Sequence, residues 1–467
     1  MIKAFQSIMN IPDLRRRILY TLFFLVIFRL GAHIPVPGIN TVAIQQMAET
    51  GGGGLFGLLD MFSGGAFKQL TVFALGIMPY ISASIILQLL TVVIPSLERL
   101  AKEGDQGRKV LTRYTRYGTI VLTAFQAYGL AMYAESMNST GHMIVMNPGF
   151  GFRLMFMITV TAGTAFLMWL GEQITERGIG NGISLLIFAG IIARMPMAVT
   201  TAIQEFNLGQ LSIFKIVIIL ALFALISAGV VLLTQGQRKL PIQHAQRVVG
   251  RRVVGGTPTY LPLKINHAGV IPVIFASSIL IFPSTIANLL GSNSSVAQFI
   301  QSFFNPYAEN MSLWRLVPTG YDRVGLLFFL KMINPYNFMF VLATVFFCYF
   351  YTAVTFNPVD VSENLKKYGA FVPGVRPGKP TSDMIDKILT RITLPGAFAL
   401  AFIAIVPEAV TIMLGVPYII SSFLGGTGLI IVVGVALDTM KQIESHLIMR
   451  HYEGFVPQRP LKGRGNW

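Results

Sequence analysis

The side chains that could perform chemistry are few and poorly placed for it. The six histidines stand at positions 33, 142, 244, 267, 446 and 451, outside the centres of the apolar segments. No aspartate lies inside those segments, and no GxxxxGK[ST] phosphate-binding loop occurs. With Cys348 as the single cysteine, neither a disulfide nor a cysteine metal cluster can form within the chain. We therefore expect no enzyme, no metal site and no cofactor.

Four ionisable residues intrude on the apolar segments. Arg29, Arg194 and Lys215 are placed where they can snorkel or pair, and Glu408 lies off-centre. An ion-coupled transporter keeps ionisable residues near the membrane midplane, and this set does not fit that need. A charge at a helix centre costs about 2.5–3.5 kcal/mol on insertion scales. Arg29 bears the largest such cost, so we expect it to serve an internal hydrogen-bonding role.

The elements that carry these residues are membrane-spanning helices. Of the 467 residues, 53% are hydrophobic and only 12% are charged, about half the charged fraction of a soluble protein. Each span needs about 20 apolar residues. The hydropathy pattern predicts an all-α integral membrane protein with about ten spans, at 18–34, 70–95, 118–134, 154–171, 183–203, 212–234, 269–290, 337–356, 393–414 and 417–437.

The net charge of +16 reports the orientation of the chain in the membrane. Lys and Arg concentrate in the N-terminus, in alternate loops and in the C-terminal segment. Because positive loops stay in the cytoplasm, we expect both termini on the cytoplasmic side of a plasma membrane.

Two of the cytoplasmic loops are unusually long. Residues 236–268 carry six basic residues and no acid, and residues 357–391 carry six basic residues against four acids. Orientation alone could account for such charges. However, a few residues beside the membrane would suffice for that, and apolar residues such as Tyr260 and Phe371 interrupt both loops. We interpret the loops as folded, protruding structure that docks a large anionic partner.

A glycine-rich segment precedes the second span. Residues 51–65 read GGGGLFGLLDMFSGG, which is apolar but too short to cross a bilayer. Irregular backbone at membrane depth requires burial in protein or a water-filled cavity. The pattern alone leaves two interpretations open, a linker on the membrane surface and a re-entrant segment inside a pore.

The second and seventh spans are bendable and mildly polar. ALGIMPYISASIILQLL at 74–90 and GVIPVIFASSILIFPSTIANLL at 269–290 contain prolines that permit bending, together with small and hydroxylated residues. Such faces allow close but separable helix contacts. Ordinary tight packing explains the same composition, and an interface that opens sideways is the functional alternative.

At these segments the sequence resembles the bacterial SecY family. The resemblance rests on six motifs in order: FSGGAFKQL at 62–70, ALGIMPYISASIILQLL at 74–90, LMWLGEQITERGIGNGIS at 167–184, GVIPVIFASSI at 269–279, NLKKYGAFVPGVRPG at 364–378 and FLGGTGLIIVVGVALD at 423–438. It implies two inverted five-helix halves, at 1–203 and 204–441, followed by a cytoplasmic tail at 442–467. It also implies a protein-conducting channel that passes unfolded polypeptides across the membrane and releases membrane-protein segments sideways.

The resemblance also implies the site residues. The pore ring would comprise Ile77, Ile81, Ile187, Ile274 and Ile431. The plug, at 55–67, would include Leu58, Phe62, Ser63, Gly64 and Gly65. The lateral gate would include Ser82, Gln88, Gln126 and Phe282. Arg251, Arg252 and Arg376 would contact the SecA motor or the ribosome.

The implied partners are SecE and SecG as small subunits, SecA or the translating ribosome as the energy source, and SecDF and YidC as further associates. The substrate would be an unfolded preprotein with a signal sequence, with membrane lipid around the channel and no direct binding to DNA. A small-solute transporter fits only the span count, and an insertase without a pore leaves the plug without a purpose. The sequence favours the channel.

Overall fold

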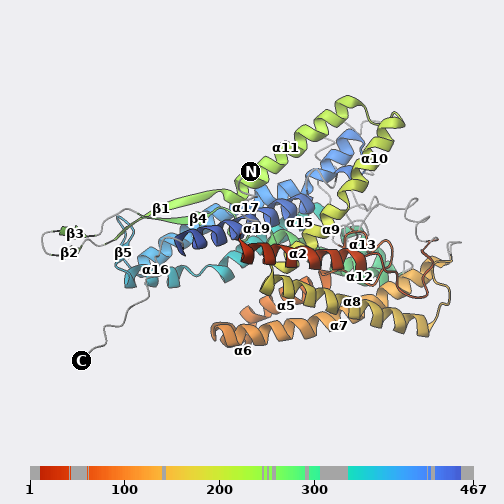
Figure 1. Ribbon diagram of the computed structural model, residues 1–467, viewed down its shortest axis with the longest axis horizontal. Coiled ribbons are helices and arrows are strands. Elements are labelled where there is room, and N and C mark those ends of the chain that lie inside the picture. Colours follow the sequence, from red (N-terminus) through yellow and green to blue (C-terminus); the bar gives the residue numbers. More distant parts are fainter. Residues whose placement is uncertain are drawn as a thin grey trace.

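The computed structural model of the chain is almost entirely helical (Figure 1). It describes residues 11–41, 43, 60, 63–138, 143–244, 247–249, 252–254, 259–289, 294–304, 335–417, 419–421 and 426–453. The plug residues Leu58 and Phe62 and the loop residue Arg251 lie outside these described residues.

In the first part of the chain, the described residues form a series of helices. Its helices are α2 (Pro12–Gly31), α5 (Met78–Val93), α6 (Pro95–Lys102), α7 (Asp105–Met137), α8 (Phe150–Arg177), α9 (Gly182–Ala193) and α10 (Met195–Asn207). Helix α9 begins where the sequence supplies a cap. The Asn181 side chain accepts hydrogen bonds from the amides of Ile183 and Ser184, which satisfies otherwise unpaired donors at the start of the helix.

The second part alternates helices with a small sheet. Its elements are α11 (Ile213–Gln235), β1 (Gln237–His244), β2 (Arg247–Val249), β3 (Arg252–Val254), β4 (Thr259–Lys264), α12 (Ile271–Leu289), α13 (Ser295–Phe304), α15 (Pro335–Thr355), α16 (Pro358–Lys367), β5 (Ala370–Phe371), α17 (Lys379–Leu414) and α19 (Gly426–Glu453). Helix α19 continues to Glu453, well into the segment predicted to be the tail.

Each of the ten predicted spans contains a helix. Among the described residues, six helices are long and apolar enough to cross a membrane, and the bent pair α5 and α6 adds a seventh if it counts as one span. The predicted spans at α2, α7 and α12 fall short of that test, although α12 contains a shorter apolar helix at 271–280. Arginines at positions 15, 16, 17 and 29 interrupt α2.

Two predicted spans differ in detail from the helices observed. Residues 70–77 form turns, and helix α5 begins at Met78 with Pro79 in its first turn, where a missing amide is tolerated. The expectation that Pro79 bends this helix is therefore wrong, whereas Pro283 does lie inside α12. The span at 183–203 divides at Arg194, which ends α9 and precedes α10.

The helices form two groups that meet along two seams. Helices α2, α5, α7, α8 and α9 contact one another in the first group, and α11, α12, α15, α17 and α19 do so in the second. The groups meet where α9 contacts α19, and again where α12 contacts α5 and α7. A single large core of buried apolar side chains spans both groups. The predicted boundary between the two halves, at residues 203 and 204, stays a prediction.

The two long basic loops form one folded body at one end of the molecule. Strand β1 pairs antiparallel with β4 and also with β5, which comes from the other loop. Leu240, Leu263, Val372, Ile385 and Leu389 form a separate buried cluster beneath the strands. Figure 1 shows the β1–β4 hairpin extending beyond the helices. The apolar residues in these loops predict folded, protruding structure, and the strands and the buried cluster agree with it.

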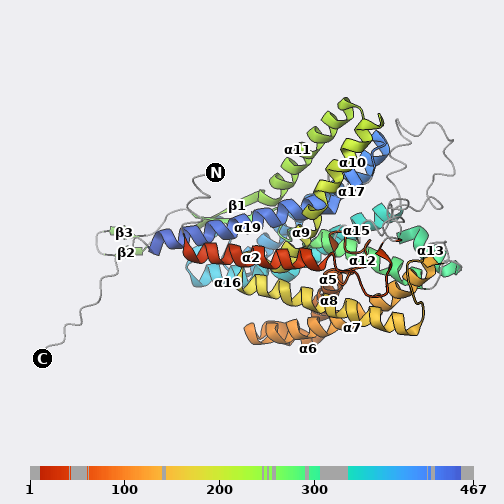
Figure 2. The same cartoon turned by 45° about the vertical axis from the view of Figure 1, so that its right-hand side comes forward.

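Helices α10 and α11 extend away from α7 and α8 in both views (Figures 1 and 2). The end of α17 packs beside them, since Val410 of α17 belongs to a buried cluster with Leu211 and Ile219. Helix α11 is the most apolar of the candidate spans and the least buried within the chain. Such a helix suits a lipid environment, because an apolar surface of this size is unfavourable in water.

Candidate functional site

The five isoleucines predicted to form the pore ring come together from four elements. Ile77 and Ile81 lie at the start of α5, Ile187 on α9, Ile274 on α12 and Ile431 on α19. All five belong to the same buried cluster, and none has more than 7% of its surface exposed. We call this set the waist. Branched aliphatic side chains gathered in this way can exclude water and ions.

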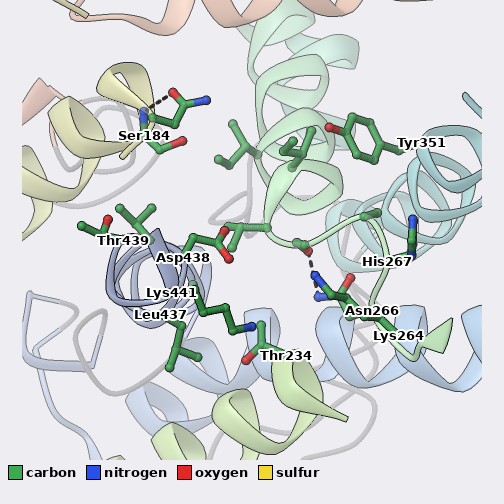
Figure 3. A pocket seen from close by; sticks show the side chains of 18 of the residues that line it. Ser184, Thr234, Lys264, Asn266, His267, Tyr351, Leu437, Asp438, Thr439 and Lys441 are labelled. Atoms are coloured by element: carbon green, nitrogen blue, oxygen red, sulfur yellow. Dashed lines mark hydrogen bonds between the residues drawn. The ribbon is translucent and has the colours of Figure 1, made fainter. Parts of the chain in front are cut away.

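A polar cavity lies on one side of the waist (Figure 3). Its volume is about 450 Å³, and Ile274 of the waist lines it. Helix α19 contributes Asp438 and Lys441 on one side, and the connection from β4 to α12 contributes Asn266 and His267 on the other (Figure 3). Because this connection leads directly from the sheet, the cavity opens towards the end of the molecule that carries the basic loops.

The described part of the predicted plug lies on the opposite side of the waist. We use the term plug segment for Asp60 and residues 63–70. Ser63 is buried, and its hydroxyl accepts a hydrogen bond from the Phe67 amide at 3.0 Å. Gly64 and Gly65 adopt positive φ angles of 69° and 94°, which glycine tolerates best. The segment therefore turns sharply and packs inside the protein, so the surface-linker interpretation is wrong for these residues.

Two arginines hold the plug segment. A guanidinium N–H of Arg29 donates to the Gly64 carbonyl at 2.8 Å, which confirms the internal hydrogen-bonding role predicted for it. The guanidinium of Arg194 forms an ion pair with Asp60 at 3.2 Å, and the Asp60 side chain is only 1% exposed. Sequence reasoning missed Asp60. An acid inside an apolar glycine-rich segment was the available signal, but its partner is far away in the chain.

Helix α9 places these features in order along one axis. Asn181 at its start lines the cavity, Ile187 belongs to the waist, and a Cβ on Gly64 of the plug segment would lie 2.8 Å from the Cα of Gly190. At 1.5 Å per residue, Ile187 is about 9 Å from Asn181, and Gly190 about 4.5 Å further on. Arg194 ends the helix beyond that. The order is cavity, waist, plug segment.

Helix α12 contacts α5 and α7, and these three helices carry the predicted lateral gate residues. Ser82 and Gln88 are on α5, Gln126 is on α7, and Phe282 is on α12. The Gln88 amide donates to the Ser84 hydroxyl at 3.2 Å, and its buried carbonyl oxygen has no partner among the described residues.

The predicted contact residues lie in the folded body of the basic loops. Arg376 is exposed between β5 and α17, and Arg252 begins β3 at the hairpin tip. These positions share one end of the molecule (Figure 1). Among the described residues no cluster of His, Cys, Asp and Glu could hold a metal ion.

The structure is a membrane-embedded helical bundle in which a polar cavity, an apolar waist and a plug segment follow one another along one axis. This arrangement defines a channel. The side chains at the waist are aliphatic, which suits a gate and not a catalytic centre.

Comparison with known proteins shows which channel family this is. The SecY family profile matches residues 71–440. The chain is 43% identical to the protein translocase subunit SecY of Escherichia coli over 457 residues, covering 98% of this chain and 97% of that protein. It is also 43% identical to the SecY subunit of Thermus thermophilus, covering 99% and 100%. The chain therefore belongs to the SecY family, and it is the protein-conducting channel subunit of the Sec translocase.

Solved structures share this fold at low sequence identity. One described as a protein-conducting channel superimposes with a TM-score of 0.60 at 16% identity, covering 95% of each chain. A channel in a canine ribosome-channel complex from the endoplasmic reticulum superimposes with a TM-score of 0.57 at 14% identity.

Proposed function

We propose that the waist is the constriction through which the unfolded polypeptide passes, and that the plug segment closes it on the far side. The observation that supports this most strongly is the order along α9, with the cavity, waist and plug segment at successive positions. A solved relative is described as having a plug domain that stabilises the closed state and maintains a membrane seal. The waist suits this task, because it offers no fixed hydrogen bonds to a passing chain.

The lateral gate is the seam between α12 and the pair α5 and α7. Signal sequences are apolar helices that partition into lipid, so the seam must open without breaking strong polar contacts. The small side chains of Ser82 and Ser278 on α5 and α12, together with the proline inside α12, favour such an opening. Gln88, Gln126 and Phe282 would lie on the surface that a departing helix passes.

The positive charge of the folded body formed by loops 236–268 and 357–391 indicates which partners bind there. The basic hairpin and Arg376 suit a polyanionic ribosome or the SecA motor, whose action supplies the energy that this chain does not generate. SecE and SecG would complete the complex, with SecDF and YidC as further associates. The chain would lie in the bacterial plasma membrane with both termini in the cytoplasm, because Lys and Arg concentrate in the N-terminus, in alternate loops and in the C-terminal segment.

Site-specific crosslinking tests the waist directly. A single cysteine is placed at Ile81 in a Cys348→Ser background, and the channel is reconstituted with SecE, SecG, SecA and ATP. A stalled secretory precursor carries one cysteine in its mature part. A disulfide that requires ATP and the signal sequence is expected. Absence of crosslinks at Ile81, Ile187 and Ile274 while export proceeds would show that the waist is not the path.

A matched control uses Ile192, which lies on α9 with 39% of its surface exposed and outside the buried cluster. A cysteine there is expected to give no crosslink to the precursor.

A further inference from the structure

Among the described residues, a buried ion pair joins the plug segment to the wall of the channel. Asp60 belongs to the plug segment, and Arg194 ends helix α9. Their charged groups are 3.2 Å apart, with side chains 1% and 11% exposed. A buried carboxylate is costly unless it is paired, so this contact matters far more than a surface ion pair would.

Asp60 also organises the plug segment itself. Its side-chain Oδ1 accepts a hydrogen bond from the Lys68 amide at 2.9 Å, and its carbonyl accepts one from the Gly65 amide at 3.0 Å. The carboxylate therefore has one oxygen directed to its own segment and the other to the wall. An asparagine at this position keeps an oxygen for the Lys68 amide and removes only the charge.

The other contacts with the wall do not depend on charge in the plug segment. Arg29 donates to a backbone carbonyl, and the close approach of Gly64 to Gly190 is a packing contact. The end of the plug segment is tied to the body, since the Val36 amide donates to the Leu70 carbonyl and the Val72 amide, two residues further on, donates to the Ile34 carbonyl. Movement of the start of the plug segment must therefore break the Asp60–Arg194 pair, while Leu70 stays in place.

We propose that Asp60 and Arg194 form a charged latch that sets how often the resting channel opens. This inference rests on the proposed closing role of the plug segment. Opening separates the two charges, and the closed state is favoured by the strength of their pairing in a site that excludes water. Neither residue touches the translocating chain in this role, so both are positioning residues.

The latch is tested by a double-mutant cycle on the translocase reconstituted in liposomes. The readout is passive ion leak without any precursor. Asp60→Asn and Arg194→Gln are each expected to raise the leak about tenfold or more, because either change removes the buried ion pair that opening must otherwise break. The double variant is expected to leak no more than about twice the larger single variant, since the pair acts as a unit.

Glu135 and Arg153 provide the matched control. They form an ion pair at 2.6 Å between α7 and α8 and do not contact the plug segment. Glu135→Gln and Arg153→Gln are expected to leave the leak within about twofold of the unchanged channel. Leak that is unchanged in both Asp60→Asn and Arg194→Gln, or effects that multiply in the double variant, would overturn the latch.

A crosslink separates failure of the latch from failure of the plug. Asp60→Cys and Arg194→Cys are combined with Cys348→Ser and joined by a short bifunctional maleimide. Blocked translocation after crosslinking, together with a silent Asp60→Asn, would leave the plug role intact and refute the latch. Translocation that continues through the crosslinked channel would refute the plug role itself. If Asp60→Asn does not assemble, Arg194→Gln and the crosslink still decide between these outcomes.

Discussion

The backbone amide of Gly180 donates a hydrogen bond to Oε1 of Gln442 at 2.8 Å. This contact joins the turn between α8 and α9 to the second half of α19, across the seam where the two helix groups meet. Gly180 has a φ of 86°, and a Cβ there would lie 2.9 Å from Leu185 and 3.2 Å from Thr439. The turn approaches α19 closely because it carries no side chain at that point.

Replacing Gln442 with alanine should weaken the seam. The free energy of unfolding is expected to fall by about 1 kcal/mol, since one hydrogen bond across a packed interface is lost. Thermal unfolding of the purified complex in detergent measures the change. Gln204→Ala is the control, because Gln204 is exposed on α10 away from the seam. An equal loss in both variants would show that the contact contributes nothing specific.

Replacing Gly64 with alanine should displace the plug segment. Its new Cβ would lie 2.8 Å from the backbone of Gly190, so one of the two segments must move. Passive ion leak through the reconstituted channel is expected to rise. Gly65→Ala is the matched control, because that glycine also has a positive φ but has no atom within 4 Å of the added Cβ. Backbone strain is common to both variants, so a larger leak in Gly64→Ala isolates the packing contact.

Replacing Ile187 with serine should hydrate the waist. Its side chain is 2% exposed within the buried cluster, and a hydroxyl there makes an apolar constriction easier to wet. Ion leak during plug displacement, for example in the Gly64→Ala background, is expected to increase further. The control is Ile192→Ser on the same helix, where the side chain is exposed. Equal ion leak in Ile187→Ser and Ile192→Ser would show that the barrier to ions does not lie at the waist.

The cavity contains a titratable group, His267, that should make stability depend on pH. Burial lowers the pKa of His267 from its ordinary value of 6.5, and the neighbouring Lys264 lowers it further. The folded protein therefore binds this proton less readily than the unfolded chain does. Stability is fully present above about pH 6.5 and is lost as the pH falls through the lowered pKa.

His267→Gln tests this by removing the titration. The ring contact between His267 and Phe356 is lost at every pH, so the absolute stability is not the readout. Thermal unfolding is compared between about pH 7 and pH 5, and the variant should show a shallower decline. His244→Gln, at the end of strand β1 and outside the cavity, is the control. A decline of unchanged steepness in His267→Gln would mean that another group titrates.

Sequence reasoning predicted the fold because long apolar helices and basic loops can each be recognised from a short stretch of sequence. The role of Arg29 followed from the cost of a charge inside a span, and the structure supplies its acceptor on Gly64. Local patterns could not pair Asp60 with Arg194, because nothing near either residue indicates the other. The same limit applies to β1 and β5, which come from two loops treated separately and pair through Gln243 and His244.

The plug illustrates where composition stops being informative. A short glycine-rich apolar segment suits both a surface linker and a buried re-entrant turn, and only contacts distinguish them. The positions of Ser63 and Gly64 against the channel wall provide those contacts. The pore ring shows the opposite case, because buried isoleucine is common in any membrane helix, and only a match to a family singles out five of them.

The folded body formed by the two basic loops, 236–268 and 357–391, is joined to the membrane helices by very short connections. Strand β1 follows α11 after Gly236 alone, the Ile265 amide donates to the Gly236 carbonyl at 2.9 Å, and β4 leads into α12 within a few residues. We expect so short a connection to transmit a force applied at the tip of the β1–β4 hairpin to α12, the helix that carries Ile274 of the cavity wall and contacts α5 and α7.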